Sequence, residues 1–362
     1  MPTVTRTILM PILKPLPPQT WPEFGADLRT AWKLAMHATN KMTAMLVATD
    51  LQQHADEGKL PAFPKVNTYR FGTQEAPHLP TGTVSQLDRY MRRRYTGKNS
   101  KGQRVRWAVH VGQQACPNST RDVLPIRAQD WKYGLLPSGE AFVDVPILRV
   151  SDGVLKRYKL ILKSGKEFAR QYAIFKSMCD GTIKSRDIKI IQKSVGSTGA
   201  MPAVVIAVDL PVRENRGDGV ITVRTASDTL LDVFAPQRTP PLWRYHAEHV
   251  RRWMAEHRRH AQAMANDAKF EPRQERGTLA PRRAVFSLKY NNRMNTMIDD
   301  VSRYVVNLVQ RQHAATVEWD DAVRWPGGEV PYAALKAKIM QKCELEGIGF
   351  SDITVPAVKA GS

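Results

Sequence analysis

The chain has 362 residues, which is enough for two or three domains and for a sizeable buried core. Its formal net charge of +20 and pI of about 10.0 are too one-sided to be explained by solubility alone and indicate a polyanionic partner, with nucleic acid as the default. Residues 1–200 hold 31 Lys and Arg against 15 Asp and Glu, and residues 201–362 hold 23 against 19. The resulting +16 and +4 predict that the first region binds a phosphate backbone.

Two sequence features exclude other classes of protein. The three cysteines, Cys116, Cys179 and Cys343, are too scattered for a disulfide framework or a zinc knuckle, and they fit a reducing cytoplasm. The longest continuous apolar run, residues 203–208, is too short to span a bilayer, so we expect a soluble protein with no membrane partner. A basic ribosome-associated protein remains an alternative.

Residues 1–124 read as a strand followed by a helical region. The opening TVTRTILMPIL alternates and is rich in β-branched residues, four prolines then interrupt it, and residues 24–50 repeat apolar side chains at helical spacing. Residues 84–107 place basic side chains beside Tyr90, Tyr95 and Trp107, a composition that suits phosphate contact and base stacking. The predicted nucleic-acid contacts here are Arg92, Arg93, Arg94, Lys101 and Arg104. A solvated helix face is the alternative.

Residues 125–200 contain short strand-like runs, FVDVPILRV, RYKLILK and DIKIIQK, separated by turns. They predict an antiparallel β region that joins residues 1–23 in a small β-barrel, with residues 24–124 inserted as a helical lobe. Further nucleic-acid contacts are expected from Lys184, Arg186, Lys189 and Lys193.

Residues 201–362 follow a different pattern. Three strands, AVVIAVDLPV, GVITVRT and TLLDVFA, are typical of the meander that opens an RNase H-like sheet. A basic helix over residues 241–268, a loop rich in Pro, Arg and Gly, a helix over residues 289–313, a strand and a helix over residues 332–346 complete the predicted domain. The basic residues expected to contact nucleic acid are Arg251, Arg252, Arg258, Arg259, Arg282 and Arg283. The histidines of the first helix lie among these arginines, which favours phosphate over a metal ion.

Two acids, Asp209 and Glu318, each end an apolar strand. A carboxylate is costly to bury unpaired, and two acids brought together from strand ends are what a Mg²⁺-dependent nuclease needs. The pair is therefore the candidate catalytic and metal site. Two solvated strand-end acids are the alternative.

The order of these parts resembles the transposon-encoded TnpB nucleases and the type V CRISPR effectors derived from them. AVVIAVDLPV is similar to the strand that carries the first catalytic Asp, Pro281-Arg282-Arg283 to the Arg-rich segment, and Asn295, Ser302, Val305 and Val306 fit the helix motif N-x6-S-x2-V-V. Glu318 matches the second catalytic acid, and GIGFSDITVP is similar to the later glycine-and-valine strand. The resemblance implies a wedge barrel over residues 1–23 and 125–200, a recognition lobe over residues 24–124 and a RuvC-like domain over residues 201–362.

The family also implies a zinc ribbon and a third catalytic Asp after the last of these segments, and the printed sequence shows neither; Asp352 precedes the expected position. We therefore expect an α+β, multi-domain protein that binds double-stranded DNA under the direction of a guide RNA, with absent or impaired cleavage. One alternative is an active Mg²⁺-dependent endonuclease that uses Asp209 and Glu318, with a second protein copy or subunit as a further partner. Another is a basic RNA-binding protein without guided recognition.

Overall fold

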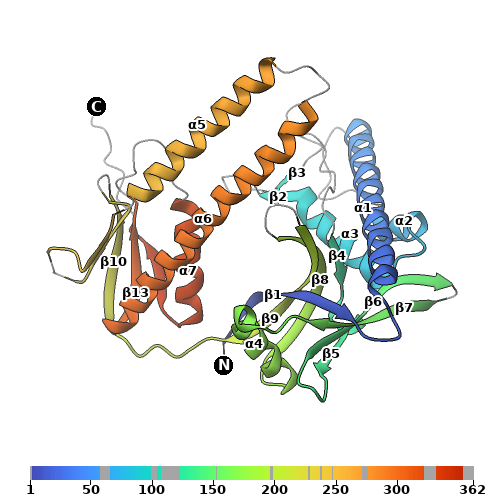
Figure 1. The fold of residues 1–362 in the computed structure, drawn as a ribbon, viewed down its shortest axis with the longest axis horizontal. Coiled ribbons are helices and arrows are strands. Elements are labelled where there is room, and N and C mark those ends of the chain that lie inside the picture. The colour runs from blue at the N-terminus through green and yellow to red at the C-terminus, as the bar shows by residue number, and fades with distance from the viewer. Residues whose placement is uncertain are drawn as a thin grey trace. The chain divides into compact units, whose positions relative to one another are not determined.

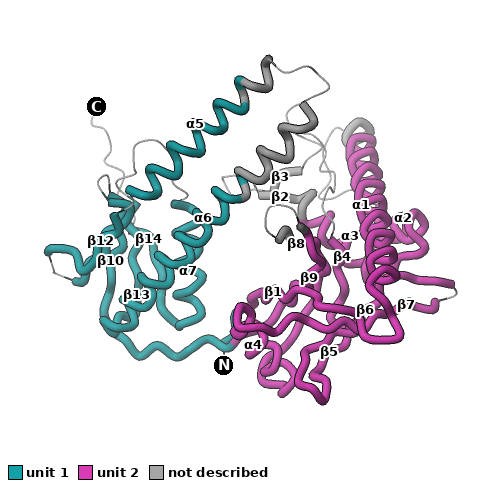
Figure 2. Tube along the Cα trace, viewed as in Figure 1, with its two compact units in different colours: residues 1–4, 211–362 teal, residues 5–210 magenta. Residues whose placement is uncertain are grey.

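A computed structural model describes residues 2–57, 66–98, 104–106, 123–151, 153–195, 199–226, 229–236, 239–246, 248–270, 276–321 and 332–353. The chain forms two compact units, residues 5–210 and residues 1–4 with 211–362, drawn in magenta and teal in Figure 2. The fold is mixed α+β, as the sequence predicted. The boundary between the units follows residue 210, ten residues later than the predicted one.

The unit of residues 5–210 is built on a seven-stranded sheet with the order β4-β8-β9-β1-β7-β6-β5 (Figure 1). The strands are β1 (Thr3–Pro15), β4 (Val123–Ile126), β5 (Lys132–Leu135), β6 (Ala141–Ser151), β7 (Val154–Leu162), β8 (Lys184–Val195) and β9 (Gly199–Pro211). This order has two ends, β4 and β5, and no pairing joins these two strands among the described residues. The closed barrel therefore stays a prediction.

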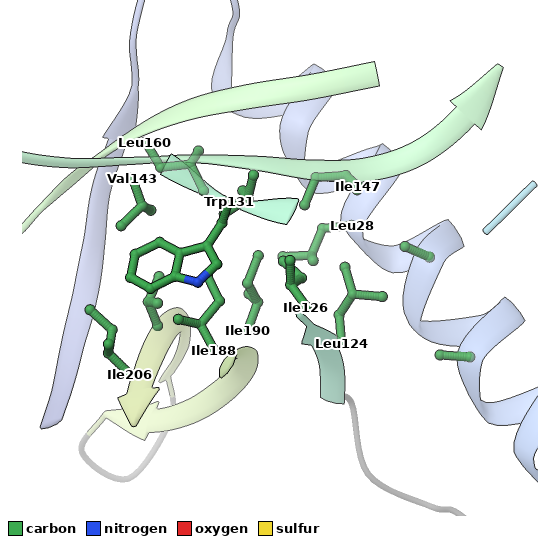
Figure 3. Close-up of a cluster of buried hydrophobic side chains, with 14 of the residues drawn as sticks. Leu28, Leu124, Ile126, Trp131, Val143, Ile147, Leu160, Ile188, Ile190 and Ile206 are labelled. Carbon is green, nitrogen blue, oxygen red and sulfur yellow. The ribbon is translucent and has the colours of Figure 1, made fainter. Parts of the chain in front are cut away.

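Helices complete this unit. They are α1 (Trp21–Glu57), α2 (Thr68–Glu75), α3 (Thr81–Tyr95) and α4 (Ala169–Cys179), with short 3₁₀ turns at Ala128–Asp130 and Lys166–Phe168 and a small hairpin of β2 (Thr96–Lys98) and β3 (Arg104–Arg106). The apolar face predicted within residues 24–50 is largely buried, although Met36 is exposed, and it shares one core with the sheet. Figure 3 shows Trp131 among Val143, Ile188 and Ile206 in that core. The predicted helical lobe and β region are thus packed together in one unit.

The other unit is built on a five-stranded sheet with the order β12-β11-β10-β13-β14. Its strands are β10 (Gly219–Thr225), β11 (Leu231–Phe234), β12 (Trp243–Tyr245), β13 (Ala314–Asp320) and β14 (Gly349–Asp352). Strands β10, β11 and β12 form an antiparallel meander, whereas β13 runs parallel to β10 and β14 runs parallel to β13. The meander is one strand later in the chain than the sequence predicted.

Three helices, α5 (Glu248–Phe270), α6 (Arg276–Arg311) and α7 (Tyr332–Leu345), pack against this sheet. Val223, Val233 and Val317 from the strands share a core with side chains of all three helices. Because side chains alternate along a strand, the residues next to these three point to the opposite face of the sheet. Helix α6 begins at Arg276, so part of the predicted Pro- and Arg-rich loop is helical. No helix in the described ranges is both long and apolar enough to cross a membrane.

Strand AVVIAVDLPV is the main correction to the predicted fold. As part of β9 it pairs antiparallel with β8, with Ala203 opposite Ile191 and Asp209 opposite Lys184, so it belongs to the seven-stranded sheet and does not open the five-stranded one. An apolar strand can be buried in either sheet. Strand β8, in which buried and exposed residues alternate, is the neighbour with which it pairs. The third strand of the meander is β12, which the sequence had placed within a helix.

Candidate nucleic-acid interface and metal-site residues

Asp209 is a buried carboxylate with protein partners on both oxygens. Its residue is 7% exposed, and the Arg186 Nε lies 2.7 Å from Oδ1 and 2.8 Å from Oδ2. Thr5 Oγ1 donates a further hydrogen bond to Oδ1 at 2.7 Å. Burial acts to raise the pKa of Asp209, but the hydrogen bonds from Thr5 and Arg186 and the charges of Arg186 and Lys184 outweigh it and hold the pKa below its usual value. Asp209 therefore joins β1, β8 and β9 as an ionised group.

Glu318 lies on β13 between the buried residues Val317 and Trp319 and points to the face of the five-stranded sheet opposite the helices. It is partly exposed. The residues beside it in register are Thr222 on β10 and Ser351 on β14. Neither neighbouring position supplies a second carboxylate.

The structure does not bring Asp209 and Glu318 together in one sheet. Asp209 belongs to the sheet of residues 5–210 and Glu318 to the sheet of the other unit, which corrects the prediction that both end strands of one RNase H-like sheet. The strand that opens the five-stranded sheet, β10, has the sequence GVITVRT and contains no acid. Among the described residues, no three His, Cys, Asp or Glu side chains are placed to hold a metal ion. These donors do not fit a Mg²⁺ site, which requires converging oxygen ligands.

A row of four charged residues crosses the face of the five-stranded sheet that carries Glu318. Register aligns Asp320 on β13, Arg224 on β10, Asp232 on β11 and Arg244 on β12, and we call these four residues the charged row. Arg224 Nε donates to Asp320 Oδ2 at 2.7 Å, and Arg244 Nε lies 3.9 Å from Asp232 Oδ2. The acid side chains are 8% and 14% exposed, whereas Arg224 and Arg244 are 48% and 53% exposed. Sequence reasoning missed this row, although the alternation in ITVRT and the acids after Glu318 were visible signals.

The guanidinium of Arg224 is fixed by a second contact. It lies 5.2 Å from the ring centroid of Phe234, which is two residues from Asp232 on β11 and therefore on the same face. An aromatic ring and a carboxylate together hold the planar group over the middle of the sheet. The row is consequently an ordered ion-pair arrangement with its cationic groups toward solvent.

Strand β8 carries the four basic residues predicted from the sequence as nucleic-acid contacts in this region. Lys184, Arg186 and Lys189 are exposed and Lys193 is half-buried. The register shifts by one residue between Ser185 and Ile188, and this bulge keeps all four basic side chains on the outer side while Ile188 remains in the core. We call these four residues the β8 stripe.

Tyr90 on α3 is 53% exposed and lies beside the β8 stripe, because Lys189 Nζ is 5.6 Å from its ring centroid. Arg93 is also exposed on this helix. An exposed ring flanked by cations can stack on a base while the cations contact phosphate. Arg92 donates hydrogen bonds to Asp88, Thr68 and the carbonyl of Val66 and so joins α3 to α2; its contact with nucleic acid stays a prediction.

The remaining residues predicted to contact nucleic acid lie either on α5 or outside the described part of the chain. Arg251, Arg252, Arg258 and Arg259 are all exposed on α5. His249 contacts the Tyr245 hydroxyl at 2.9 Å, and its ring centroid lies 4.8 Å from that of Trp253. His257 stacks on Tyr290, so both histidines contact aromatic rings. Lys101 and the side chains of Arg94, Arg104, Arg282 and Arg283 lie outside the described residues.

No protein-family model and no curated protein matches this chain. Among solved structures, it is similar to Cas12f1 in the Cas12f1–sgRNA–target DNA complex, with a TM-score of 0.74, 12% sequence identity and coverage of 96% of this chain and 88% of that chain. It also matches the CRISPR–Cas12f ternary complex, with a TM-score of 0.45, 12% identity and coverage of 92% and 72%. The first similarity confirms, at the level of the fold, the predicted resemblance to type V CRISPR effectors.

Proposed function

We propose that this chain binds double-stranded DNA under the direction of a guide RNA, as a compact effector related to TnpB and type V CRISPR proteins, with absent or impaired DNA cleavage. The observation that carries this proposal is the fold shared with Cas12f1 over 96% of this chain, since that protein was solved with sgRNA and target DNA. In such complexes base pairing reads the sequence, and the protein holds the heteroduplex by its shape and phosphates.

The five-stranded sheet supports an RNase H-like assignment for residues 211–362. An antiparallel three-strand meander is followed by two strands parallel to its first strand, and the first strand lies in the middle of the order β12-β11-β10-β13-β14. We assign β10 as the opening strand of the RuvC-like domain. We likewise assign the seven-stranded sheet to the wedge domain and α1, α2 and α3 to the recognition lobe, as the resemblance implies.

Two basic surfaces support the nucleic-acid partners. The β8 stripe with Tyr90 lies on the unit of residues 5–210, and the exposed arginines of α5 lie on the other unit. Residues 1–200 alone carry 31 Lys and Arg against 15 Asp and Glu. Lys and Arg that neutralise phosphates release counterions, so we expect affinity to fall steeply with salt.

The donor set supports binding without efficient cleavage. RuvC-like cleavage depends on Mg²⁺ held by acids from neighbouring strands. Here Asp209 already binds Arg186 and Thr5 within a different sheet, and Glu318 is flanked by Thr222 and Ser351. Mg²⁺ thus remains an expectation tied to the endonuclease alternative, which no geometry among the described residues favours.

The decisive experiment is to purify the full chain from cells, sequence the nucleic acid that copurifies, and measure binding to matched and scrambled duplexes. A discrete RNA and matched-target affinity at least about 100-fold tighter at physiological salt are expected, since specific recognition commonly exceeds non-specific binding by about 10³ or more. Equal affinity for both duplexes, with no discrete RNA, overturns the proposal and favours the basic RNA-binding alternative.

Cleavage is measured in parallel on the same matched duplex with Mg²⁺. DNA cutting that is abolished by both Asp209→Ala and Glu318→Ala would establish the endonuclease alternative. Mass measurement of the loaded complex then shows whether a second protein copy takes part.

A further inference from the structure

The charged row occupies the part of the five-stranded sheet where an RNase H-like domain would need its metal ligands. Under the assignment proposed above, β10 and β13 are the two strands whose acids should converge. Their face carries Thr222 and Arg224 on β10 against Glu318 and Asp320 on β13. A hydroxyl and a guanidinium therefore stand where the first-strand carboxylate is required.

Arg224 changes the electrostatics of this position as well as its ligand set. Its Nε lies 2.7 Å from Asp320 Oδ2, within the range of a strong charge-assisted hydrogen bond. A divalent ion bound by Asp320 would have to displace this guanidinium or lie beside it, and either change is opposed by the fixed positive charge. The ring of Phe234 contacts Arg224 from β11, where Asp232 lies opposite Arg224 in register.

We infer that Arg224 replaces the divalent ion in this sheet: its guanidinium neutralises Asp320 and excludes metal from the face that carries Glu318. The inference rests on the proposed RNase H-like assignment. It gives the proposed absence of cleavage a specific cause, which is an arginine on β10 in place of a metal-binding acid. The acids of the charged row, Asp320 and Asp232, are 8% and 14% exposed. Asp320 accepts from Arg224, and Asp232 accepts from the Thr229 hydroxyl at 2.5 Å, so both already have protein partners. The donor chemistry is that of an ion-pair network.

The inference is tested by titrating the 362-residue chain with Mn²⁺ and measuring the free ion by electron paramagnetic resonance. Wild type and Glu318→Gln should take up Mn²⁺ equally, because Glu318 ligates no metal. Arg224→Asp should gain one Mn²⁺ site with at least tenfold higher affinity than any site in wild type, since it removes the guanidinium and adds a carboxylate between Asp320 and Asp232 in the row. Arg259→Asp on α5, an exposed position flanked by basic residues, makes the same charge change and should gain none.

A wild-type Mn²⁺ site that weakens tenfold or more in Glu318→Gln overturns the inference, as does a folded Arg224→Asp protein with no gain. Because Arg224→Asp can also destabilise the sheet, Arg224→Gln is titrated beside it and should raise Mn²⁺ affinity by about threefold or more. Metal uptake is measured without guide or target. If Arg224→Asp gains a Mn²⁺ site but the chain shows no guided DNA binding, the proposed function is rejected and the inference on Arg224 is not.

Discussion

Replacing Asp209 by Asn tests whether this acid is a structural ion pair or a metal ligand. The substitution keeps the size of the side chain and one acceptor oxygen but removes the charge that Arg186 and Thr5 satisfy. Buried hydrogen bonds to charged groups contribute about 1.5–3 kcal/mol each. Because Arg186 is 55% exposed and partly screened, and because Asn keeps an acceptor, we expect a total loss of about 2 kcal/mol.

The assay is thermal unfolding of the full chain in EDTA and again with excess Mg²⁺. For a unit of this size, about 2 kcal/mol lowers Tm by about 4–8 °C. Glu318→Gln is the matched control and should change stability by less than about 0.5 kcal/mol, since no hydrogen bond to Glu318 is seen in the described part of the chain. Unchanged stability of Asp209→Asn in EDTA, combined with a Mg²⁺-dependent Tm in wild type alone, would refute the structural role.

The pH dependence of the stability difference between wild type and Asp209→Asn is an independent test of the ion pair. The folded-state pKa of Asp209 is lowered from its ordinary value, so its ion pair stabilises the protein at pH values above the unfolded pKa of about 3.9. That stability is lost as pH falls through the folded pKa. The difference between wild type and Asp209→Asn should be constant from about pH 5 to 8 and shrink below about pH 4. A difference that grows on acidification would contradict the reasoning.

Three further predictions concern the nucleic-acid surface and the cores. Lys189→Glu in the β8 stripe should weaken binding of matched and scrambled duplexes alike and lower the slope of log affinity against log salt by about 1 or more, measured by fluorescence anisotropy. Tyr90→Leu should weaken binding about tenfold while Tyr90→Phe keeps it, since a ring is needed for stacking; equal losses in both would argue against stacking. Burial raises the pKa of the Cys343 thiol to about 12, so a thiol reagent at about pH 8 should modify Cys343 only after unfolding, as peptide mass spectrometry would show.

The sequence predicts the helices and the position of Glu318 well because their signals are local. Apolar residues at helical spacing mark α1, α6 and α7; α1 and α7 are found close to the predicted residues, whereas α6 begins thirteen residues earlier than predicted, at Arg276. Prediction fails at α4, because the sequence predicts a continuous β region where these eleven residues between β7 and β8 form a helix. The helix buries only Phe175 and Met178, and two buried residues are too few for a helical repeat to be recognised in the sequence.

Sheet membership is the part that local patterns do not determine. The run AVVIAV is compatible with either core. Only its pairing with β8, the strand before it in the chain, rather than with β10, the strand after it, places Asp209 in the seven-stranded sheet. The basic residues of the β8 stripe can be identified from the sequence alone. That all four lie on the outer side of the sheet depends on a β-bulge, which the sequence does not reveal.

An acid at the end of a strand has chemical meaning only with the neighbours that pairing gives it. Asp209 beside Arg186 is a structural anion, and Asp320 beside Arg224 is a counter-ion. Glu318 beside Thr222 is a single carboxylate without a partner acid in register. Had β9 been the neighbour of β13, the same Asp209 and Glu318 would have lain side by side and the metal interpretation would follow. Because β10 takes that place and brings Arg224 with it, the local electrostatics favour an ion pair over a divalent ion.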